Sequence, residues 1–342
     1  MSEKKEVLVS VKGLQTYFPV KKGLFKKTVA HVKAVDTVNL EIYRGEILGV
    51  VGESGCGKTT LGKSILQLVK PTGGEINYKF DDGVKNLREA DKAQMDIARQ
   101  KMQIVFQDPY SSLNPAFTVF GSMEEPLLKN GMKSKEARRE KIASLLKAVN
   151  LPEEYMTRYP NEFSGGQRQR IGIARALSVD PEFIVCDEAV SALDVSIQAQ
   201  VLNLLKQLKE ERNLTYMFIT HDLSVVEYIS DRICVMYLGK IVELAKTEEL
   251  FKNTLHPYTQ ALLSAIPIAD IKKKRKRMPL QGDVPNPVNP PPGCPFHPRC
   301  PKCTEICKTQ VPPTKRFLVD GEEHLVCCHL DCGELEANRI SD

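Results

Sequence analysis

Residues 52–59 read Gly-Glu-Ser-Gly-Cys-Gly-Lys-Thr, which fits the pattern G-x-x-x-x-G-K-T. An apolar run at 47–51 precedes this segment, and a helix-compatible run at 61–68 follows it. In that context the glycines let the backbone curl so that consecutive N–H groups face a polyphosphate, while the following helix adds the positive end of its dipole. Lys58 would reach the β- and γ-phosphates, and the Thr59 hydroxyl would ligate Mg²⁺. The alternative is a glycine-rich strand-to-helix turn with a solvated lysine.

A second candidate for phosphate chemistry is the pair of carboxylates at the end of an apolar run. Residues 183–186 are apolar, and Asp187 and Glu188 follow them directly. This pattern predicts a buried strand whose last residue directs Mg²⁺. On a continuing strand Glu188 would point the other way, where it could polarise a water against a γ-phosphate. The alternative is an ordinary pair of surface carboxylates.

Composition bounds the class of protein. The 342 residues are 42% apolar, so a sizeable core can form, and the formal net charge is +5. No apolar run reaches the roughly 18 residues that crossing a bilayer requires, and the polar first six residues lack the apolar core of a signal peptide. We therefore expect a cytosolic chain, in which the ten cysteines would be metal ligands or reduced thiols rather than disulfides.

The positive charge is concentrated in one place, because residues 272–277 are six consecutive Lys and Arg residues. The simpler interpretation is a solvated linker; attraction to anionic lipid or nucleic acid is the alternative. The run is too short to serve as a nucleic-acid groove, so we expect no nucleic-acid partner.

Hydrophobic periodicity places the remaining elements. Residues 7–18 alternate like an edge strand and residues 35–42 like another, so the two could form an antiparallel lid over a nucleotide. Tyr17 and Phe18 then lie where a ring could stack on adenine, with core packing as the alternative for each. We also expect helices at 132–150, 168–177 and 196–211, a buried strand at 216–220, and a hairpin at 232–237 and 240–244 that turns at Gly239.

With these elements in place, the chain resembles ATP-binding-cassette (ABC) ATPases. Ser164-Gly165-Gly166-Gln167 is similar to the family signature, although Phe163 stands where Leu is usual, and Ala189 stands where Pro often follows the catalytic Glu. The other family elements occur in the expected order. Gln107 matches the Q-loop, Asp187 and Glu188 match the Walker B Asp and catalytic Glu, Ser191 to Asp194 match the D-loop, and His221 matches the switch histidine.

The resemblance covers residues 7 to about 265. It implies an α/β P-loop fold with a RecA-like core, an antiparallel β subdomain and a helical subdomain at about 108–178, followed by a small Cys/Pro-rich extension at 266–342. It also implies a set of site residues. ATP would be bound by Tyr17, Phe18, Gly52, Ser54, Gly55, Cys56, Gly57, Lys58, Thr59 and Thr60; Mg²⁺ by Thr59, Gln107 and Asp187; and hydrolysis would use Glu188, His221 and Gln107.

The signature predicts a second phosphate-binding element. A helix beginning at Gly165 and Gly166 would offer bare N–H groups to a γ-phosphate. The phosphate loop of the same chain already holds its own nucleotide, so the residues Ser164 to Gln167 should serve a partner's nucleotide, as in the head-to-tail dimers of the family. Ser191 and Asp194 of the D-loop would complete that arrangement.

Within the family, residues 168–177 and 187–200 resemble the F-type ATPase subunit of oligopeptide and dipeptide importers. Residues 255–263 and 293–301 resemble segments shared by the peptide and nickel importer branch. The resemblance implies a D-type ATPase subunit as partner, although a homodimer is the alternative. It also implies two permease subunits, an extracellular or periplasmic peptide-binding protein, and a peripheral place at the cytoplasmic face of the membrane.

Seven cysteines follow residue 290. Cys294, Cys300, Cys307 and Cys327 are separated by five, six and nineteen residues, and four such thiolates could hold a [4Fe–4S] cluster, which some members of this importer branch carry. The C-x₂-C pair of Cys300 and Cys303 leaves a zinc knuckle open, and reduced free thiols are the third interpretation.

Two other functions stay open. The same ATPase could drive uptake of nickel, glutathione or another small solute, because the ATPase subunit never touches the solute. A soluble cassette ATPase that acts on ribosomes or DNA is the alternative of another class. Such proteins usually have two cassettes in one chain or a long coiled-coil insert, and neither feature occurs here.

Overall fold

The computed structural model describes residues 5–23, 27–108, 113–266, 278–333, 335 and 339–340. The basic run at 272–277 therefore lies outside the described residues. The chain divides into two compact units. The first unit comprises Met1–Ile42, Ile47–Arg88 and Thr220–Asp342, and the second comprises Tyr43–Glu46 and Glu89–Ile219.

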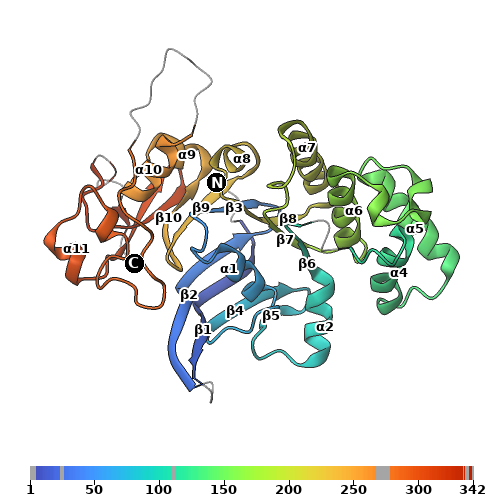
Figure 1. Cartoon of the computed structure of the whole chain (residues 1–342), viewed down its shortest axis with the longest axis horizontal. Helices are drawn as coiled ribbons and strands as arrows, with labels where there is room; N and C mark the ends of the chain where they lie inside the picture. Colours follow the sequence, from blue (N-terminus) through green and yellow to red (C-terminus); the bar gives the residue numbers. More distant parts are fainter. Residues whose placement is uncertain are drawn as a thin grey trace, which may run out of the picture. The chain divides into compact units, whose positions relative to one another are not determined.

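The first unit contains two sheets and short helices. Its elements are β1 (Val7–Lys22), β2 (Lys27–Tyr43), β3 (Ile47–Val51), α1 (Lys58–Ile65), β4 (Gly73–Phe80), β5 (Gly83–Asn86), α8 (Leu223–Ile229), β9 (Arg232–Tyr237), β10 (Lys240–Lys246), α9 (Thr247–Lys252), α10 (Pro257–Ser264), α11 (Glu305–Thr309), β11 (Thr314–Val319), β12 (Glu322–Cys327) and β13 (Arg339–Ile340). Figure 1 labels most of them.

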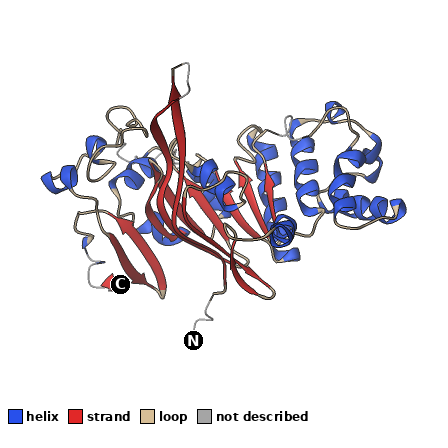
Figure 2. Cartoon of the chain, turned by 90° about the horizontal axis from the view of Figure 1, so that it is seen from below, coloured by secondary structure: helices blue, strands red, loops and turns tan. Residues whose placement is uncertain are grey.

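One sheet of this unit has the strand order β2-β1-β4-β5, and β4 runs antiparallel to both β1 and β5. The long strands β1 and β2 form the tall twisted ribbon of Figure 2. The predicted antiparallel sheet is therefore present. The prediction that 7–18 is an edge strand is wrong, because β1 lies between β2 and β4. Alternation along a single strand does not reveal how many neighbours that strand has.

The other sheet of the first unit places β3 parallel to β9 and β9 antiparallel to β10, as the predicted hairpin requires. Strands β12, β11 and β13 continue it beyond β10, each antiparallel to its neighbour. The C-terminal strands thus extend the sheet that begins at β3. Buried Glu243 on β10 and His324 on β12 join the two parts through a 2.9 Å contact between Oε1 and Nε2.

The second unit combines a parallel sheet with most of the longer helices. Its elements are α2 (Lys92–Lys101), β6 (Met102–Val105), α4 (Val119–Lys129), α5 (Lys135–Ala148), α6 (Gly165–Leu177), β7 (Phe183–Asp187), α7 (Val195–Arg212) and β8 (Thr215–Ile219). Strand β7 is parallel to both β6 and β8, and all five of its residues are buried. The helices predicted at 168–177 and 196–211 correspond to α6 and α7.

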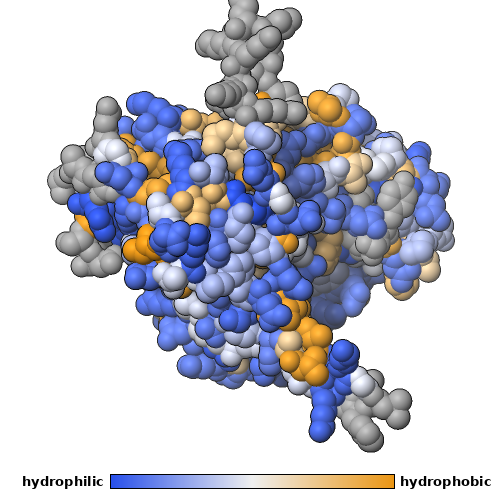
Figure 3. Space-filling view, turned by 60° about the vertical axis from the view of Figure 1, so that its left-hand side comes forward, coloured by the Kyte–Doolittle hydropathy of each residue, from blue (hydrophilic) through white to orange (hydrophobic). Residues whose placement is uncertain are grey.

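No helix within the described ranges combines the length and the apolar character that a bilayer crossing needs. On the face turned forward in Figure 3, hydrophilic side chains predominate among the described residues and apolar ones form small separate patches. The domain boundaries at 265 and at 108–178 stay predictions.

Candidate functional site

The phosphate loop lies between β3 and α1, as its pattern predicts. Helix α1 begins at Lys58, directly after Gly57, whose φ of 105° is in the left-handed region. A Cβ on Gly57 would lie 2.0 Å from the Ala34 carbonyl oxygen, and one on Gly52 would lie 2.2 Å from the Met236 oxygen. Both obstacles are backbone, so these two glycines are required by packing as well as by conformation.

Lys58 is 5% exposed, and its ammonium group donates to carbonyl oxygens of its own loop. The acceptors are Gly52 at 2.7 Å and Glu53 at 3.0 Å. The side chain therefore curls back over the loop in the position where it would meet a β- or γ-phosphate. Cys56 behaves differently from its neighbours, because its side chain is buried and burial raises the pKa of its thiol. Only its backbone is placed to face a phosphate.

Strand β1 carries Tyr17 and Phe18, and the neighbouring strand β2 passes beside the phosphate loop at Ala34. Ala34, which packs on Gly57, is followed by Asp36, and Tyr17 donates its hydroxyl to Asp36 Oδ1 at 2.6 Å. Lys240 contacts the other oxygen of Asp36 at 2.9 Å. The Tyr17 side chain is thus half-buried and held, whereas Phe18 is 41% exposed and its ring is accessible. Which ring stacks on adenine stays a prediction.

His221 lies at the same end of the first unit as the loop. The Thr220 N–H donates to the Val50 carbonyl at 3.2 Å, two residues before the phosphate loop begins. Asp222 caps α8 by accepting from the Ser224 N–H at 2.9 Å. His221 is exposed, and its position is fixed by its two neighbours: Thr220 is hydrogen-bonded to β3, and Asp222 caps α8.

The second unit brings Gln107, Asp187 and Glu188 together. Strands β6 and β7 are parallel, so the residues after them share one edge of the sheet. There the Gln107 Nε2 donates to Glu188 Oε2 at 2.8 Å. Asp187 is 5% exposed at the end of β7. The catalytic and Mg²⁺-binding roles of these three side chains stay predictions.

The conformation of Glu188 differs from the sequence prediction of a strand residue that points the other way. Its φ is 49°, in the left-handed region, and its N–H donates to the Ile219 carbonyl at 2.9 Å. Ser191 holds the turn from the other side, because its N–H at 3.1 Å and its hydroxyl at 2.9 Å both donate to the Glu188 carbonyl. A non-glycine residue with positive φ is uncommon, and such strain concentrates at functional positions.

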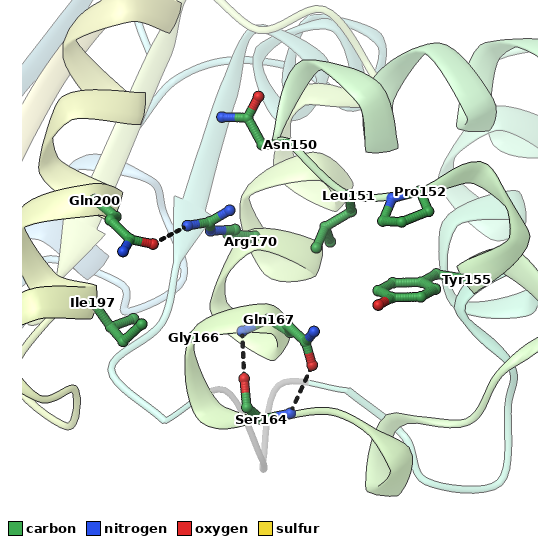
Figure 4. Close-up of a pocket in the computed structure, with 10 residues that line it drawn as sticks. All are labelled: Asn150, Leu151, Pro152, Tyr155, Ser164, Gly166, Gln167, Arg170, Ile197 and Gln200. Carbon is green, nitrogen blue, oxygen red and sulfur yellow. Dashed lines mark hydrogen bonds between the residues drawn. The ribbon is translucent and has the colours of Figure 1, made fainter.

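The signature residues form the start of α6. Ser164 caps the helix by accepting from the Gln167 N–H at 3.3 Å, and its own N–H donates to Gln167 Oε1 at 3.0 Å. Figure 4 shows this reciprocal pair beside a cavity of about 280 Å³, which is also lined by Ile197 and by the hydrogen-bonded pair Arg170 and Gln200. Ser164 is exposed and Gly165 is half-buried, so this end of α6 is accessible, whereas Gly166 is buried.

Two features of this region escaped the sequence analysis. A Cβ on Gly166 would lie 2.4 Å from Ile197 Cγ2, so this glycine lets α6 approach α7 closely. Asp194 of the D-loop is the N-cap of α7, accepting from the Ile197 N–H at 3.0 Å. The Asp194-x-x-Ile197 spacing was visible in the sequence as a helix start, but no sequence signal indicated the contact between Gly166 and Ile197.

The four predicted cluster ligands, Cys294, Cys300, Cys307 and Cys327, stay a prediction, and Cys328 enters the same group of thiols through its electrostatic interactions. Cys294 donates its N–H to the Cys307 carbonyl at 2.8 Å. Burial, with smaller contributions from the thiols of Cys307, Cys328 and Cys300, raises the pKa of the Cys294 thiol to about 12. The thiol of Cys327 interacts electrostatically with that of Cys234, and its Sγ lies 3.3 Å from the Thr314 hydroxyl. Cys328, which directly follows the last residue of β12, interacts electrostatically with the thiols of Cys300 and Cys307.

Across the part of the chain that the structure describes, no three His, Cys, Asp or Glu side chains are arranged to hold a metal ion. The four thiols interact electrostatically without converging on one point. Their chemistry fits a thiolate-bound cluster, but binding one would require the thiols to move closer together.

The chain is similar to known proteins over nearly its whole length. Residues 35–191 match the family model described as "ABC transporter", and residues 242–307 match "Oligopeptide/dipeptide transporter, C-terminal region". The chain is 52% identical to the oligopeptide transport ATP-binding protein AppF of Bacillus subtilis, over 95% of this chain and 98% of that protein. It is 50% identical to the dipeptide transport ATP-binding protein DppF of Escherichia coli, over 96% of each chain.

Among solved structures, a dimeric, post-hydrolysis form of the ATP-binding cassette MJ0796 with ADP and phosphate is similar, with a TM-score of 0.61 and 32% identity. The match covers 70% of this chain and 99% of that one. The cassette CbiO1 from Clostridium perfringens, part of an ABC transporter complex, gives a TM-score of 0.60 at 25% identity, over 72% of this chain and 92% of that one.

Proposed function

Because the chain belongs to the ATP-binding proteins of ABC transporters, we propose that it is the ATP-hydrolysing subunit of an importer for oligopeptides or dipeptides. The observation that carries this proposal is the chain-long similarity to two peptide-transport ATPases, at 52% and 50% identity. The similarity includes the C-terminal region, which matches a model specific to oligopeptide and dipeptide transporters. Nickel, glutathione and non-transport functions have no comparable support.

The first unit would hold ATP. The backbone N–H groups of residues 52–60 would surround the phosphates, and Lys58 would exchange its carbonyl acceptors for phosphate oxygens. Thr59 would ligate Mg²⁺, and Tyr17 or Phe18 would stack on adenine. His221 would contact the γ-phosphate from the end of the first unit where the loop lies.

Hydrolysis would use the side chains that the second unit groups together. Glu188 would accept a proton from the attacking water, which adds to the γ-phosphorus as the bond to the bridging oxygen of ADP breaks. The hydrogen bond from Gln107 supports this role, because it orients the Glu188 carboxylate. Asp187 and Gln107 would complete the Mg²⁺ shell. Mg²⁺, when bound, would neutralise charge that develops on the phosphate oxygens.

The signature would act on a second ATPase subunit. Ser164 is exposed and caps α6, so the N–H groups of Gly165 and Gly166 can meet a phosphate that belongs to another chain. Ser191 and Asp194 would border the same contact. We propose that this second ATPase subunit is of the D type. Two permeases would form the membrane-spanning part of the transporter, and a peptide-binding protein would act on the extracellular or periplasmic side of the membrane. The chain itself would lie peripherally at the cytoplasmic face.

For the C-terminal cysteines we propose a [4Fe–4S] cluster with Cys294, Cys300 and Cys307 as three ligands and Cys328 as the fourth. The electrostatic interactions among these four thiols support the choice. After anaerobic purification, iron and sulfide should be present and should be lost in Cys328→Ser but retained in Cys327→Ser. Stoichiometric zinc without iron would replace this proposal with a zinc site.

The transport proposal is tested by co-expressing the chain with candidate permeases. The chain should pellet with membranes only when its permeases are present. In reconstituted vesicles with a peptide-binding protein, ATP hydrolysis should rise on addition of di- or oligopeptides. Stimulation by nickel or glutathione instead would reassign the solute. Membrane-independent association with ribosomes would reject the transport function.

A further inference from the structure

A residue of the phosphate loop is held from two sides by the C-terminal part of the chain. The Arg299 guanidinium donates from Nη1 to Glu53 Oε2 at 2.6 Å and from Nη2 to Glu53 Oε1 at 3.1 Å. The Tyr258 hydroxyl accepts the backbone N–H of Glu53 at 2.8 Å. Glu53 is thus bound through its side chain and through its backbone by residues more than 200 positions later in the chain.

The contact with Arg299 is a two-pronged, partly buried ion pair. The Arg299 side chain is 6% exposed and that of Glu53 is 27% exposed. A guanidinium with two parallel hydrogen bonds to one carboxylate fixes direction as well as distance, which a lysine cannot do. The geometry therefore restrains the orientation of Glu53 in addition to balancing its charge.

An aromatic cluster anchors both holding residues to the sheet beside the loop. The Tyr237 ring lies 4.8 Å from that of Tyr258 and 5.2 Å from that of Phe296, and the Tyr258 and Phe296 rings lie 5.4 Å apart. Tyr237 ends β9, and Phe296 lies three residues before Arg299. His256 adds a 3.1 Å hydrogen bond from the Tyr258 N–H to its Nδ1.

Glu53 also contacts the residue that binds phosphate. Its carbonyl accepts from the Lys58 ammonium at 3.0 Å. A displacement of Glu53 would therefore shift the position of the Lys58 ammonium group. No position on the extension needs to touch the nucleotide for this effect.

We propose that Arg299 and Tyr258 are positioning residues that hold the phosphate loop in its ATP-binding conformation through Glu53, so that the C-terminal segment sets the affinity for ATP. The inference rests on the proposed assignment of residues 52–60 as the ATP site. A loop with three glycines in eight residues loses much freedom when a ligand orders it. Holding one end of the loop in advance lowers that entropic cost.

The test uses the purified full chain, with a fluorescent ATP analogue and Mg²⁺ for binding and steady-state kinetics for hydrolysis. Arg299→Met and Glu53→Gln should each raise the Kd and the KM for ATP about tenfold while kcat changes less than about twofold, because binding is lost equally in the ground and transition states. The double variant should be no worse than either single one. Tyr258→Phe should raise KM about threefold, and Arg299→Lys should fall between Arg299→Met and the wild type.

Arg316→Met is the matched control, because Arg316 lies on the same extension and its ion pair with Glu323 is 3.9 Å long and 45% exposed on each side. Its KM should equal that of the wild type. Folded Arg299→Met and Glu53→Gln with wild-type Kd and KM would overturn the proposal, as would a fall in kcat at unchanged KM. If Arg299→Met does not fold, Glu53→Gln decides alone, since it keeps its volume. Lys58→Ala separates the two proposals: if it binds ATP as tightly as wild type, the ATP site itself is misplaced.

Discussion

The phosphate loop and the carboxylate turn are built in opposite ways. In the first unit, Lys58 is almost fully buried, its neighbours Gly52 and Gly57 touch backbone, and Glu53 is fixed by Arg299 and Tyr258. In the second unit most of the groups assigned to chemistry stand at or near the surface, whereas Asp187 is buried. Gln107 and Ser164 are exposed, and Glu188 is half-buried on a left-handed turn.

The difference indicates that the phosphate loop of the first unit is preformed, whereas the exposed groups of the second unit are suited to binding a ligand or another chain. Because Gly52 and Gly57 have no room for a methyl group, the fold sets this loop before any ligand arrives. The exposed groups of the second unit are oriented by hydrogen bonds within that unit, and a nucleotide or a partner chain could reach them from solvent. Changes in the first unit should therefore affect folding and affinity, whereas changes in the second should affect turnover with little loss of stability.

The largest expected effect is on turnover. Glu188→Gln should retain ATP binding while hydrolysis falls about 10²–10⁴-fold, because the amide cannot accept the proton of the attacking water. Binding is measured by nucleotide titration and hydrolysis by phosphate release. Glu211→Gln, at an exposed position of α7, is the control and should hydrolyse normally. Wild-type turnover in Glu188→Gln would refute the assignment of the base.

Next in size is the effect of adding a methyl group to the loop. Gly57→Ala places a Cβ 2.0 Å from a backbone oxygen at a φ of 105°, so the free energy of unfolding should fall by about 3 kcal/mol or more. Urea titration measures this. Gly166→Ala meets only the end of the Ile197 side chain, at 2.4 Å, so it should be milder and should be restored by Ile197→Ala. If truncating a neighbouring side chain restored the stability of Gly57→Ala, the obstacle at this position would not be the backbone.

Lowering the pH should reduce the stability of the first unit, because His256 is buried there in its neutral form. Burial lowers the pKa of His256 from 6.5 to about 4, against the opposing effect of Glu243. Between these values the unfolded chain binds a proton that the folded chain does not, so stability is highest above pH 6.5 and falls as pH drops toward 4. The loss should reach roughly 3 kcal/mol. His256→Asn, which can still cap α10 but does not titrate, should show a flatter profile in urea titrations; an unchanged profile would exclude His256 as the cause.

The smallest effect separates a helix cap from a partner contact. Ser164 caps α6 and Ser134 caps α5, each accepting a backbone N–H. Replacing either by Ala should lower the free energy of unfolding by about 1 kcal/mol. Only Ser164→Ala should also weaken ATP-dependent association of two ATPase chains, measured by light scattering on Glu188→Gln protein. Equal association for both variants would reduce Ser164 to a cap.

Local patterns predicted the phosphate loop, the strand that ends at Asp187, the helix that begins at Gly165 and the hairpin at Gly239, because each depends on residues close in sequence. What the sequence did not predict depends on distant partners. Glu188 adopts positive φ because Ile219 and Ser191 hold its backbone. Arg299 meets Glu53 across 246 positions, and no periodicity indicates such a pair.

Strand β12 has a consequence for the solubility of the chain. It pairs with β10 on the side opposite β9 and so covers a row of backbone hydrogen-bonding groups, with Glu243 opposite Val326 and Leu244 opposite Leu325. Uncovered, a largely buried strand of this kind is a template for the strands of other molecules. A chain truncated before β11 would expose the edge of β10. We expect such a chain to aggregate before its ATP binding or hydrolysis changes measurably.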